Sequence, residues 1–426
     1  MKIVLLTETF CRNMGYIYTL LPKYLARAGA EMHVISLGLS PYWRMGEHSQ
    51  MFGNFLGSEA LNPGTVEEID GYTLHVLDGR SRLGYRQMIG LGAKLRELRP
   101  DIVQTWAAIG WIPLDAARFQ RKLGYKLFTG NHNAWSTASA SLVGGPAVKV
   151  KNLLTRYVPG RMASWRTEKC YAVTEDCGEI AWRYYGVERE KVATMYLGVD
   201  TEYFYPAATS EAIEERRALR QSLGFSDSEI VCIYTGKMTE AKNARIIAQA
   251  VGRLRELGKE YSAIFIGNGV QRESIEGFPN CRVLDFMHFA KLAPYYRAAD
   301  IGVWPTNEST SMLDAAACGL PLIVSDGIVY RSHVDGNGCI FHMNDLNSLV
   351  KTLWDMEPMW VRQKMGQFGA EKMQEHFSWE SVARRRMEDY EHALCSSGAI
   401  ENALGSGRQN ASIPEHEVRG AAKTSS

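Results

Sequence analysis

Two lysines stand where a strand is expected to give way to a helix, and both could bind a phosphorylated ligand. Lys237 and Lys242 lie in YTGKMTEAKN, where the strand should end at Gly236 and the helix should start near Lys242. The start of a helix presents unpaired backbone N–H groups and a partial positive charge, which suit a phosphate or diphosphate when two ammonium groups lie beside it. Two solvated lysines on a loop would give the same pattern, so both interpretations stay open.

Two acids occupy a similar position further along, in WPTNESTSMLDAAACGLPLIVSD. We expect a buried strand to end at Pro305 and a helix to follow the hydroxyl-rich turn STS. Glu308 and Asp314 would then lie at the C-terminal edge of a parallel sheet, where open α/β sheets bind ligands. Carboxylates accept hydrogen bonds from vicinal sugar hydroxyls, so a nucleotide sugar would fit. The alternative is that Asp314 is a partner of the helix dipole and Glu308 a surface acid.

A glycine turn follows another buried strand, in FIGNGVQRES. Gly267 and Gly269 form only part of a dinucleotide-binding fingerprint, because Arg272 stands where its third glycine would be. The turn could let a ligand approach the backbone, or it could be a plain tight turn.

The elements that would position these residues form an α/β pattern. Short apolar segments such as KIVLLT, DIVQTW, EIVCIYTG, SAIFIGNG and PLIVSD alternate with helical periodicity, which predicts parallel sheets covered on both faces. A chain of 426 residues suits two domains. Turn formers and a proline in 196–212 place the boundary near residue 205. After a late helical segment, the Ser- and Gly-rich tail is predicted to be disordered from about Ser396.

Composition excludes several classes of protein. A net charge of +1 argues against nucleic-acid binding through bulk charge. The eight cysteines show neither CxxC nor metal-ligand spacing, which is typical of reduced thiols in a cytoplasmic protein without a bound metal. The first apolar run stops at Glu8 and resembles a strand more than a signal peptide, and no run is long enough to span a bilayer.

The stretch 149–169 carries six basic residues and one acid among Leu, Tyr, Val and Trp. A basic amphipathic surface suits anionic lipids at the inner face of a membrane or a lipid-linked acceptor. An ordinary solvated helix face is the alternative.

Four segments, taken in order, resemble the retaining GT-B glycosyltransferases of family GT4. GKMTEAK is similar to the family's G-R-L-x-x-E-K, LGVDTEYFYP to N-G-V-D-x-x-x-F-x-P, LAPYYRAAD to L-x-x-Y-Y-x-x-A-D, and LDAAACGLPLIV to L-E-A-M-A-x-G-x-P-V-V. The resemblance implies two Rossmann-like domains facing a cleft: 1–205 on the acceptor side and 206–376 on the donor side. It also implies a helix at 377–395 that returns to the N-terminal domain.

The resemblance assigns roles in the C-terminal domain. Lys237 and Lys242 match the basic pair that binds the donor diphosphate, and Asp314 matches the acid that holds the ribose. The family's first acid stands eight positions earlier, where this chain has Thr306, so we expect Glu308, the nearest carboxylate, to reach the donor sugar, with Thr306 as the alternative. The glycines usual after the first acid are replaced here by Ser309, Thr310 and Ser311.

Further matches lie nearer the sugar and the base. His132 in FTGNHNAWS matches the histidine beside the donor sugar, although a lone loop histidine is often structural. Gly15 matches the glycine loop after the first strand, and Gly267, Phe286 and Met287 match the surroundings of the base.

The function implied is transfer of a sugar, with retention, from a nucleoside-diphosphate sugar to the hydroxyl of a glycan or lipid-linked acceptor. It would need neither metal nor cofactor, and would serve glycan, polysaccharide or glycolipid synthesis. A sugar-nucleotide epimerase of the same architecture and a non-catalytic nucleotide-sugar-binding partner are the alternatives.

Overall fold

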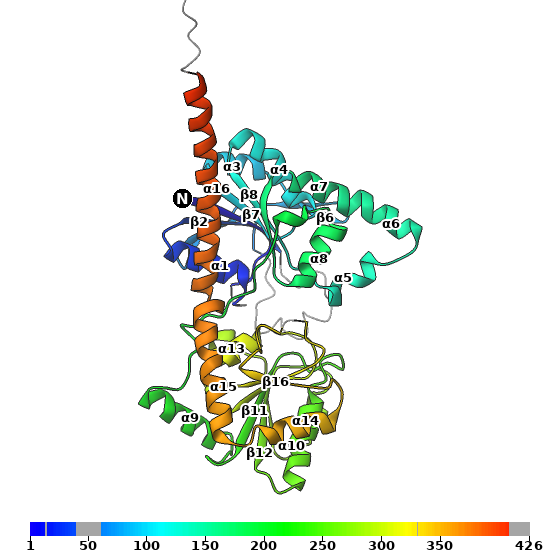
Figure 1. Cartoon of the computed structure of the whole chain (residues 1–426), viewed down its shortest axis with the longest axis vertical. Coiled ribbons are helices and arrows are strands. Elements are labelled where there is room, and N and C mark those ends of the chain that lie inside the picture. Colours follow the sequence, from blue (N-terminus) through cyan, green and yellow to red (C-terminus); the bar gives the residue numbers. More distant parts are fainter. Residues whose placement is uncertain (13–14, 40–60, 330, 409–426) are drawn as a thin grey trace, which may run out of the picture.

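The chain folds into two α/β domains joined by a linker and a long C-terminal helix. A computed structural model describes residues 1–12, 15–39, 61–329 and 331–408. Figure 1 shows the two domains stacked along the long axis of the molecule, with α15 (Met359–Lys372) beside the C-terminal domain and α16 (Trp379–Arg408) beside the N-terminal domain. No helix within these ranges is long and apolar enough to cross a bilayer.

The N-terminal domain is built on an eight-stranded sheet of order β10-β9-β8-β7-β1-β2-β4-β3. β3 pairs antiparallel with β4, and the other neighbouring pairs are parallel. The strands are β1 (Lys2–Thr9), β2 (Glu31–Leu39), β3 (Val66–Ile69), β4 (Tyr72–Val76), β7 (Ile102–Thr105), β8 (Lys126–Asn131), β9 (Thr167–Ala172) and β10 (Val192–Thr194).

Helices cover both faces of this sheet, as its apolar strands require. In β1, Ile3 and Leu5 pack with helix α1, whereas Val4 and Leu6 pack with α3 and α4, because successive side chains of a strand point to opposite faces. The helices are α1 (Ile17–Arg27), α3 (Leu91–Leu98), α4 (Trp111–Leu123), α5 (Trp135–Leu142), α6 (Pro146–Asn152), the π-helix η1 (Leu153–Tyr157), α7 (Val158–Ser164), α8 (Glu175–Tyr184) and the short 3-10 helix η2 (Arg189–Lys191). A separate antiparallel hairpin, β5 (Gly79–Arg82) and β6 (Tyr85–Met88), was not expected from the sequence.

The C-terminal domain holds a six-stranded parallel sheet of order β13-β12-β11-β14-β15-β16. Its strands are β11 (Ile230–Thr235), β12 (Tyr261–Ile266), β13 (Cys281–Leu284), β14 (Ile301–Trp304), β15 (Leu322–Ser325) and β16 (Gly338–Phe341). Its helical segments are α9 (Ser210–Ser222), α10 (Arg245–Glu256), α11 (Arg272–Glu276), η3 (Phe289–Lys291), α12 (Ala293–Ala298), α13 (Ser311–Ala317), α14 (Leu346–Asp355), α15 (Met359–Lys372) and η4 (Met373–Phe377). The parallel α/β prediction is therefore confirmed for both halves.

Both sheets have a point where the strand order reverses. In the C-terminal sheet the chain moves outward from β11 in one direction and from β14 in the other, and in the N-terminal sheet the same happens at β1 and β7. The loops that leave two such strands diverge and open a crevice at the carboxyl ends of the strands. This topology predicts that a ligand site uses the loops after β1, β11 and β14.

Helix α16 (Trp379–Arg408) begins at the linker and returns to the N-terminal domain. The N–H of Val199 donates to the carbonyl of Phe377, and the N–H of Trp379 donates to the carbonyl of Val199. Further along, the Arg386 guanidinium lies 3.3 Å from the centre of the Tyr171 ring. The helix thus links the linker to the core of the first domain.

Helix α16 continues beyond Ser396 to Arg408, into the segment for which the sequence predicts disorder. A helix that is already nucleated and packed gains one hydrogen bond for each residue added, and the Ala, Glu and Leu residues of GAIENALGSGR favour this extension. The tail after Arg408 lies outside the described residues.

Candidate active site

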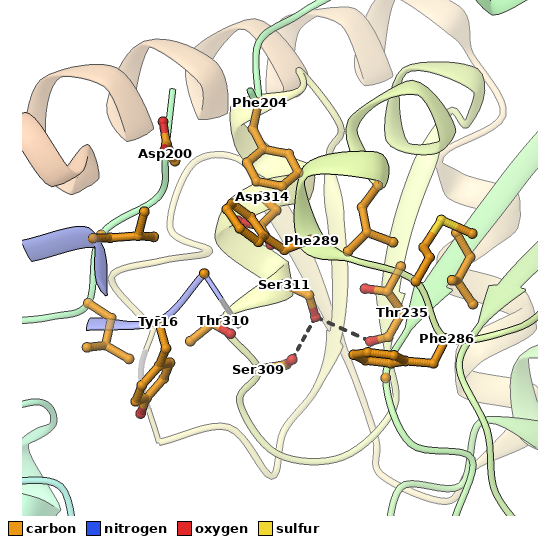
Figure 2. Close-up of a pocket in the computed structure, with 18 of the residues that line it drawn as sticks. Tyr16, Asp200, Phe204, Thr235, Phe286, Phe289, Ser309, Thr310, Ser311 and Asp314 are labelled. Carbon is orange, nitrogen blue, oxygen red and sulfur yellow. Dashed lines mark hydrogen bonds between the residues drawn. The ribbon is translucent and has the colours of Figure 1, made fainter. Parts of the chain in front are cut away.

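A cavity of about 370 Å³ lies between the two domains, beside the linker and the start of α16 (Figure 2). This volume falls within the range of small-molecule sites, about 300–1,000 Å³. As the topology predicts, its walls include the loops after β1, β11 and β14. The lining residues are Gly15, Tyr16, Leu20, Leu197, Gly198, Asp200, Phe204, Thr235, Gly236, Lys237, Ile266, Phe286, Met287, Phe289, Leu292, Ser309, Thr310, Ser311, Asp314 and Trp379.

Glycines let two strand-end loops pack directly against each other beneath this cavity. A β-carbon on Gly267, whose φ is +145°, would stand 2.0 Å from the carbonyl oxygen of Gly236. The N–H of Gly236 donates to the carbonyl of Ile266 at 3.0 Å. Gly236 lines the cavity and Gly267 does not, so Gly267 supports the shape of the site from below.

The hydroxyl-rich turn before α13 is held in place by the end of β11. The Oγ atoms of Ser309 and Ser311 lie 2.6 Å apart, and Ser311 Oγ lies 3.3 Å from the carbonyl oxygen of Thr235 (dashed lines in Figure 2). The indole N–H of Trp304 contacts both Thr235 O and Ser311 Oγ, at 3.3 and 3.2 Å. Thr310 is more exposed than its neighbours and also lines the cavity.

The two lysines lie close enough to influence each other electrostatically, but only one lines the cavity. Burial lowers the pKa of Lys237, which is in the wall. Burial also lowers the pKa of Lys242; Glu308 opposes this shift and Lys237 adds to it. The ammonium group of Lys242 donates to Asn307 Oδ1 at 2.5 Å, just outside the lining. Two partly desolvated cations that repel each other are a favourable place for a polyanion.

Two carboxyl groups line the cavity, that of the half-buried Asp314 and that of the buried Asp200. Burial, with a smaller contribution from the charge of Asp200, raises the pKa of Asp314 to about 8. Asp200 is itself held by α1, since Tyr24 Oη donates to it at 2.7 Å and Lys23 Nζ lies 3.1 Å away. Both acids lie in the upper part of Figure 2, near Phe204. The cavity therefore contains one acid that is protonated at neutral pH and one that is paired with a lysine.

Apolar side chains form the rest of the wall. Phe286 and Met287 follow β13, Phe289 belongs to η3, and Trp379 closes the linker side. The loop after β1 reaches across the cleft at Gly15, where an added β-carbon would lie 2.5 Å from the Phe289 ring. These contacts give flat apolar surfaces on which a base could stack.

His132, Lys242, Thr306, Glu308 and Gly267 do not line this cavity. His132 follows β8 and packs edge-on against Trp106, with ring centroids 6.0 Å apart. Burial, with a contribution from the positive charge of Arg386, lowers the pKa of His132 to about 4.

Thr306 and Glu308, which also lie outside the lining, are on the loop after β14. Thr306 is buried, and its carbonyl accepts a hydrogen bond from Ser325 Oγ at 2.7 Å. The Glu308 carboxylate accepts a hydrogen bond from the N–H of Val329. The loop therefore turns Glu308 toward the segment after β15.

Several lining residues were not predicted from the sequence. Asp200 lies in the LGVD segment that marked the family resemblance, so that motif was a signal that could have identified it. Tyr16, Phe204, Phe289 and Trp379 carry no local signature, because only the juxtaposition of the two domains with the linker and α16 brings them together.

Two facing parallel α/β domains, an interdomain cavity at their switch points and a helix that returns to the first domain define the GT-B class of glycosyltransferase. The model of Glycosyltransferase Family 4 matches residues 16–203, and that of Glycosyl transferases group 1 matches residues 229–356. The chain belongs to the GT4 family of GT-B glycosyltransferases.

Relatives and solved structures agree with this assignment. Spore coat protein SA of Bacillus subtilis is 22% identical over 76% of this chain and 86% of its own length. A D-inositol 3-phosphate glycosyltransferase of Thermobifida fusca is 25% identical over 53% of this chain, and the match spans only 56% of that relative.

Among structures, sucrose-phosphate synthase from Thermosynechococcus elongatus has a TM-score of 0.65 at 15% identity, covering 93% of this chain and 100% of that one. The UDP complex of HepE from Anabaena also has a TM-score of 0.65, at 14% identity, covering 91% of this chain and 99% of that one.

Proposed function

We propose that this protein is a retaining glycosyltransferase that moves a sugar from a nucleoside-diphosphate sugar to an acceptor hydroxyl. The observation that carries the proposal is the grouping of Lys237, Asp314 and the hydroxyls of 309–311 around one interdomain cavity, with Lys242 just behind it. Each part of a nucleotide sugar has a matching chemical group there.

The donor is assigned to the cavity by chemistry. The diphosphate lies against Lys237 and the hydroxyls of Ser309 and Ser311, with Lys242 adding positive charge. The Asp314 carboxyl holds the ribose hydroxyls, and the base lies against Phe286 and Met287. HepE, which shares the fold, has been crystallised with UDP and with UDP-glucose, and this supports a nucleotide-sugar donor.

The chemistry requires stabilisation of a leaving diphosphate. The bond between the anomeric carbon and the diphosphate oxygen breaks, the acceptor oxygen bonds to the same face of that carbon, and the acceptor's proton passes to the departing diphosphate. Lys237 and Lys242 stabilise the charge that develops on that diphosphate without a metal ion. His132 lies outside the cavity lining and is uncharged at neutral pH, because its pKa is about 4, so we assign it no part in stabilising the leaving charge.

The acceptor belongs to glycan, polysaccharide or glycolipid synthesis. Names among the relatives, such as spore coat protein SA and the putative glycosyltransferase EpsF of Bacillus subtilis, support a role in surface polymers. The donor sugar, the base and the linkage are to be found by screening.

The test begins with a thermal-shift screen of UDP-, GDP- and ADP-sugars, followed by assays of donor hydrolysis and of transfer to candidate acceptors. Lys237→Ala and Lys242→Ala should each weaken donor binding roughly ten- to hundredfold, because each removes a charge-assisted contact. Lys364→Ala, an exposed lysine on α15, is the matched control and should change nothing.

Three outcomes would overturn the proposal. They are donor binding that survives both lysine changes, conversion of the donor sugar without an acceptor, and a product with inverted anomeric configuration. Activity that is lost in EDTA and restored by a divalent cation would overturn the metal-independent mechanism alone.

A further inference from the structure

The helical run α6–η1–α7, residues 146–164, presents a continuous apolar surface to solvent. The side chains of Val150, Leu154, Val158 and Met162 are between 42% and 63% exposed and are spaced four residues apart. Residues four apart lie on one face of a helix. We call this face, together with the neighbouring exposed residues, the apolar stripe: Val150, Leu153, Leu154, Tyr157, Val158, Met162 and Trp165.

The exposure of the stripe does not come from a loosely attached helix, because the opposite face is firmly held. Asn152 is buried, and its Nδ2 donates to the carbonyls of Ser141 and Leu142 at 3.1 and 3.3 Å. Gly160 packs so tightly that a β-carbon there would stand 1.9 Å from the carbonyl oxygen of Tyr185. The fold fixes which face is buried and leaves the apolar stripe outward.

The charges carried by the stretch of chain around the stripe are of one sign, although Glu188 from a later segment pairs with Arg161 at 3.4 Å. No Asp or Glu occurs between residues 116 and 167, whereas nine Lys or Arg residues do. Lys149, Lys151 and Arg166 are exposed beside the stripe. Interfaces between proteins are depleted in lysine, whereas a bilayer surface with anionic lipids accepts apolar side chains and attracts lysine and arginine together.

We propose that the apolar stripe and its flanking lysines dock the N-terminal domain onto an anionic lipid bilayer. Figure 1 shows α6 and α7 at the side of that domain away from α1 and α16, so neither of these helices covers them. The proposal does not depend on the donor chemistry, since it rests on surface residues outside the cavity.

The position of the stripe has a consequence for the cleft. Helix α5 connects the apolar stripe to the loop that carries His132. This loop is fixed by two hydrogen bonds: Trp135 N donates to Asp176 Oδ2 at 2.8 Å, and Asn133 Nδ2 donates to Tyr185 Oη at 3.2 Å. A docked molecule therefore holds the acceptor side of its cleft close to the membrane.

The test is vesicle flotation of the full chain at about 0.15 M salt, with phosphatidylcholine alone or mixed with phosphatidylglycerol. We expect binding to the anionic vesicles, weakened by high salt. Lys149→Gln combined with Lys151→Gln should reduce the partition coefficient roughly twentyfold, since each lysine near an anionic surface contributes about fivefold. Leu154→Glu and Trp165→Glu should abolish binding without lowering the Tm, because both side chains are 63% exposed.

Trp360→Glu is the matched control, since Trp360 is 68% exposed on α15 of the other domain and should leave flotation unchanged. Equal loss of binding in Trp165→Glu and Trp360→Glu would overturn the proposal. Absence of binding to anionic vesicles would also overturn it. So would a protein that binds no lipid, has twice the mass of one chain in solution, and has the mass of one chain once Leu154→Glu is introduced.

Discussion

Gly15 lies against the ring of Phe289, so close that a β-carbon on Gly15 would stand 2.5 Å from Cδ1 and Cγ of that ring. Gly15 belongs to the loop after β1 and Phe289 to η3, so this contact joins the two domains across the candidate donor cavity. A glycine is required there twice over, because its φ of +59° is also one that other residues rarely adopt.

Gly15→Ala should therefore separate the domains at this contact and weaken donor binding, by roughly tenfold or more if the cleft cannot close. Gly258→Ala is the matched control, because Gly258 has a similar positive φ of +78° and open space around it. Both changes should lower the Tm through backbone strain, but only Gly15→Ala should raise the donor Kd measured by calorimetry. Unchanged affinity in Gly15→Ala would contradict a role for this contact.

As pH rises, donor binding should weaken at a lower pH than it would if Lys237 and Lys242 were exposed lysines with ordinary pKa values. Burial lowers the pKa of Lys237 and of Lys242 below the usual value of about 10.4. A lowered lysine pKa means that the charge which attracts the diphosphate is present at low pH and is lost as pH rises through that pKa. Calorimetric titration with UDP from pH 7 to 10 should show this loss. Lys237→Arg should flatten the profile, since a guanidinium keeps its charge.

Asp314 should make the folded state less stable as pH rises. Its pKa is raised to about 8, against about 3.9 for an unfolded chain, so between these values the folded protein holds a proton that the unfolded chain has released. Stability is therefore full below about pH 4 and falls as pH rises from about 4 to about 8. Asp314→Asn, which mimics the protonated acid, should be more stable than wild type, and its advantage should be about 3 to 4 kcal/mol larger at pH 8.5 than at pH 5.

Urea unfolding at the two pH values checks this prediction. The same difference between variant and wild type at pH 5 and pH 8.5 would show that the carboxyl does not carry a raised pKa. Because the donor's ribose is assigned to this residue, the variant should also bind donor less tightly at both pH values.

The folded protein should lose stability when the polar contact between α16 and the first domain is removed. Tyr390 Oη donates to Gln104 Oε1, which also accepts from Arg386 Nη1 at 3.1 Å, and all three residues are buried. Tyr390→Phe should reduce the free energy of unfolding by about 1 kcal/mol, the net contribution of one hydrogen bond. Tyr203→Phe, at a side chain that is 41% exposed, should have less effect. Equal effects of Tyr390→Phe and Tyr203→Phe in denaturant titrations would show that this contact does not stabilise the fold.

The sequence by itself determined the two α/β halves and the most recognisable part of the site. Apolar strands, helical periodicity and turn residues act over a few neighbours, so they place Lys237 on a loop and Ser311 and Asp314 at the start of a helix, at the carboxyl ends of strands. Those residues line the cavity. The same local rules predicted a basic segment at 149–169 but could not say which of its side chains face solvent.

Only the tertiary structure decided how the cavity is completed. Gly15 meets Phe289, and Asp200 meets Tyr24, across sequence separations of more than 170 residues, and no local pattern encodes such meetings. It also turned Glu308 toward Val329 and left His132 and Lys242 outside the lining, because the direction of a loop side chain depends on what packs around the loop. Residue type and spacing determine the chemistry of a local segment, whereas a site between two domains depends on long-range packing that brings distant segments together.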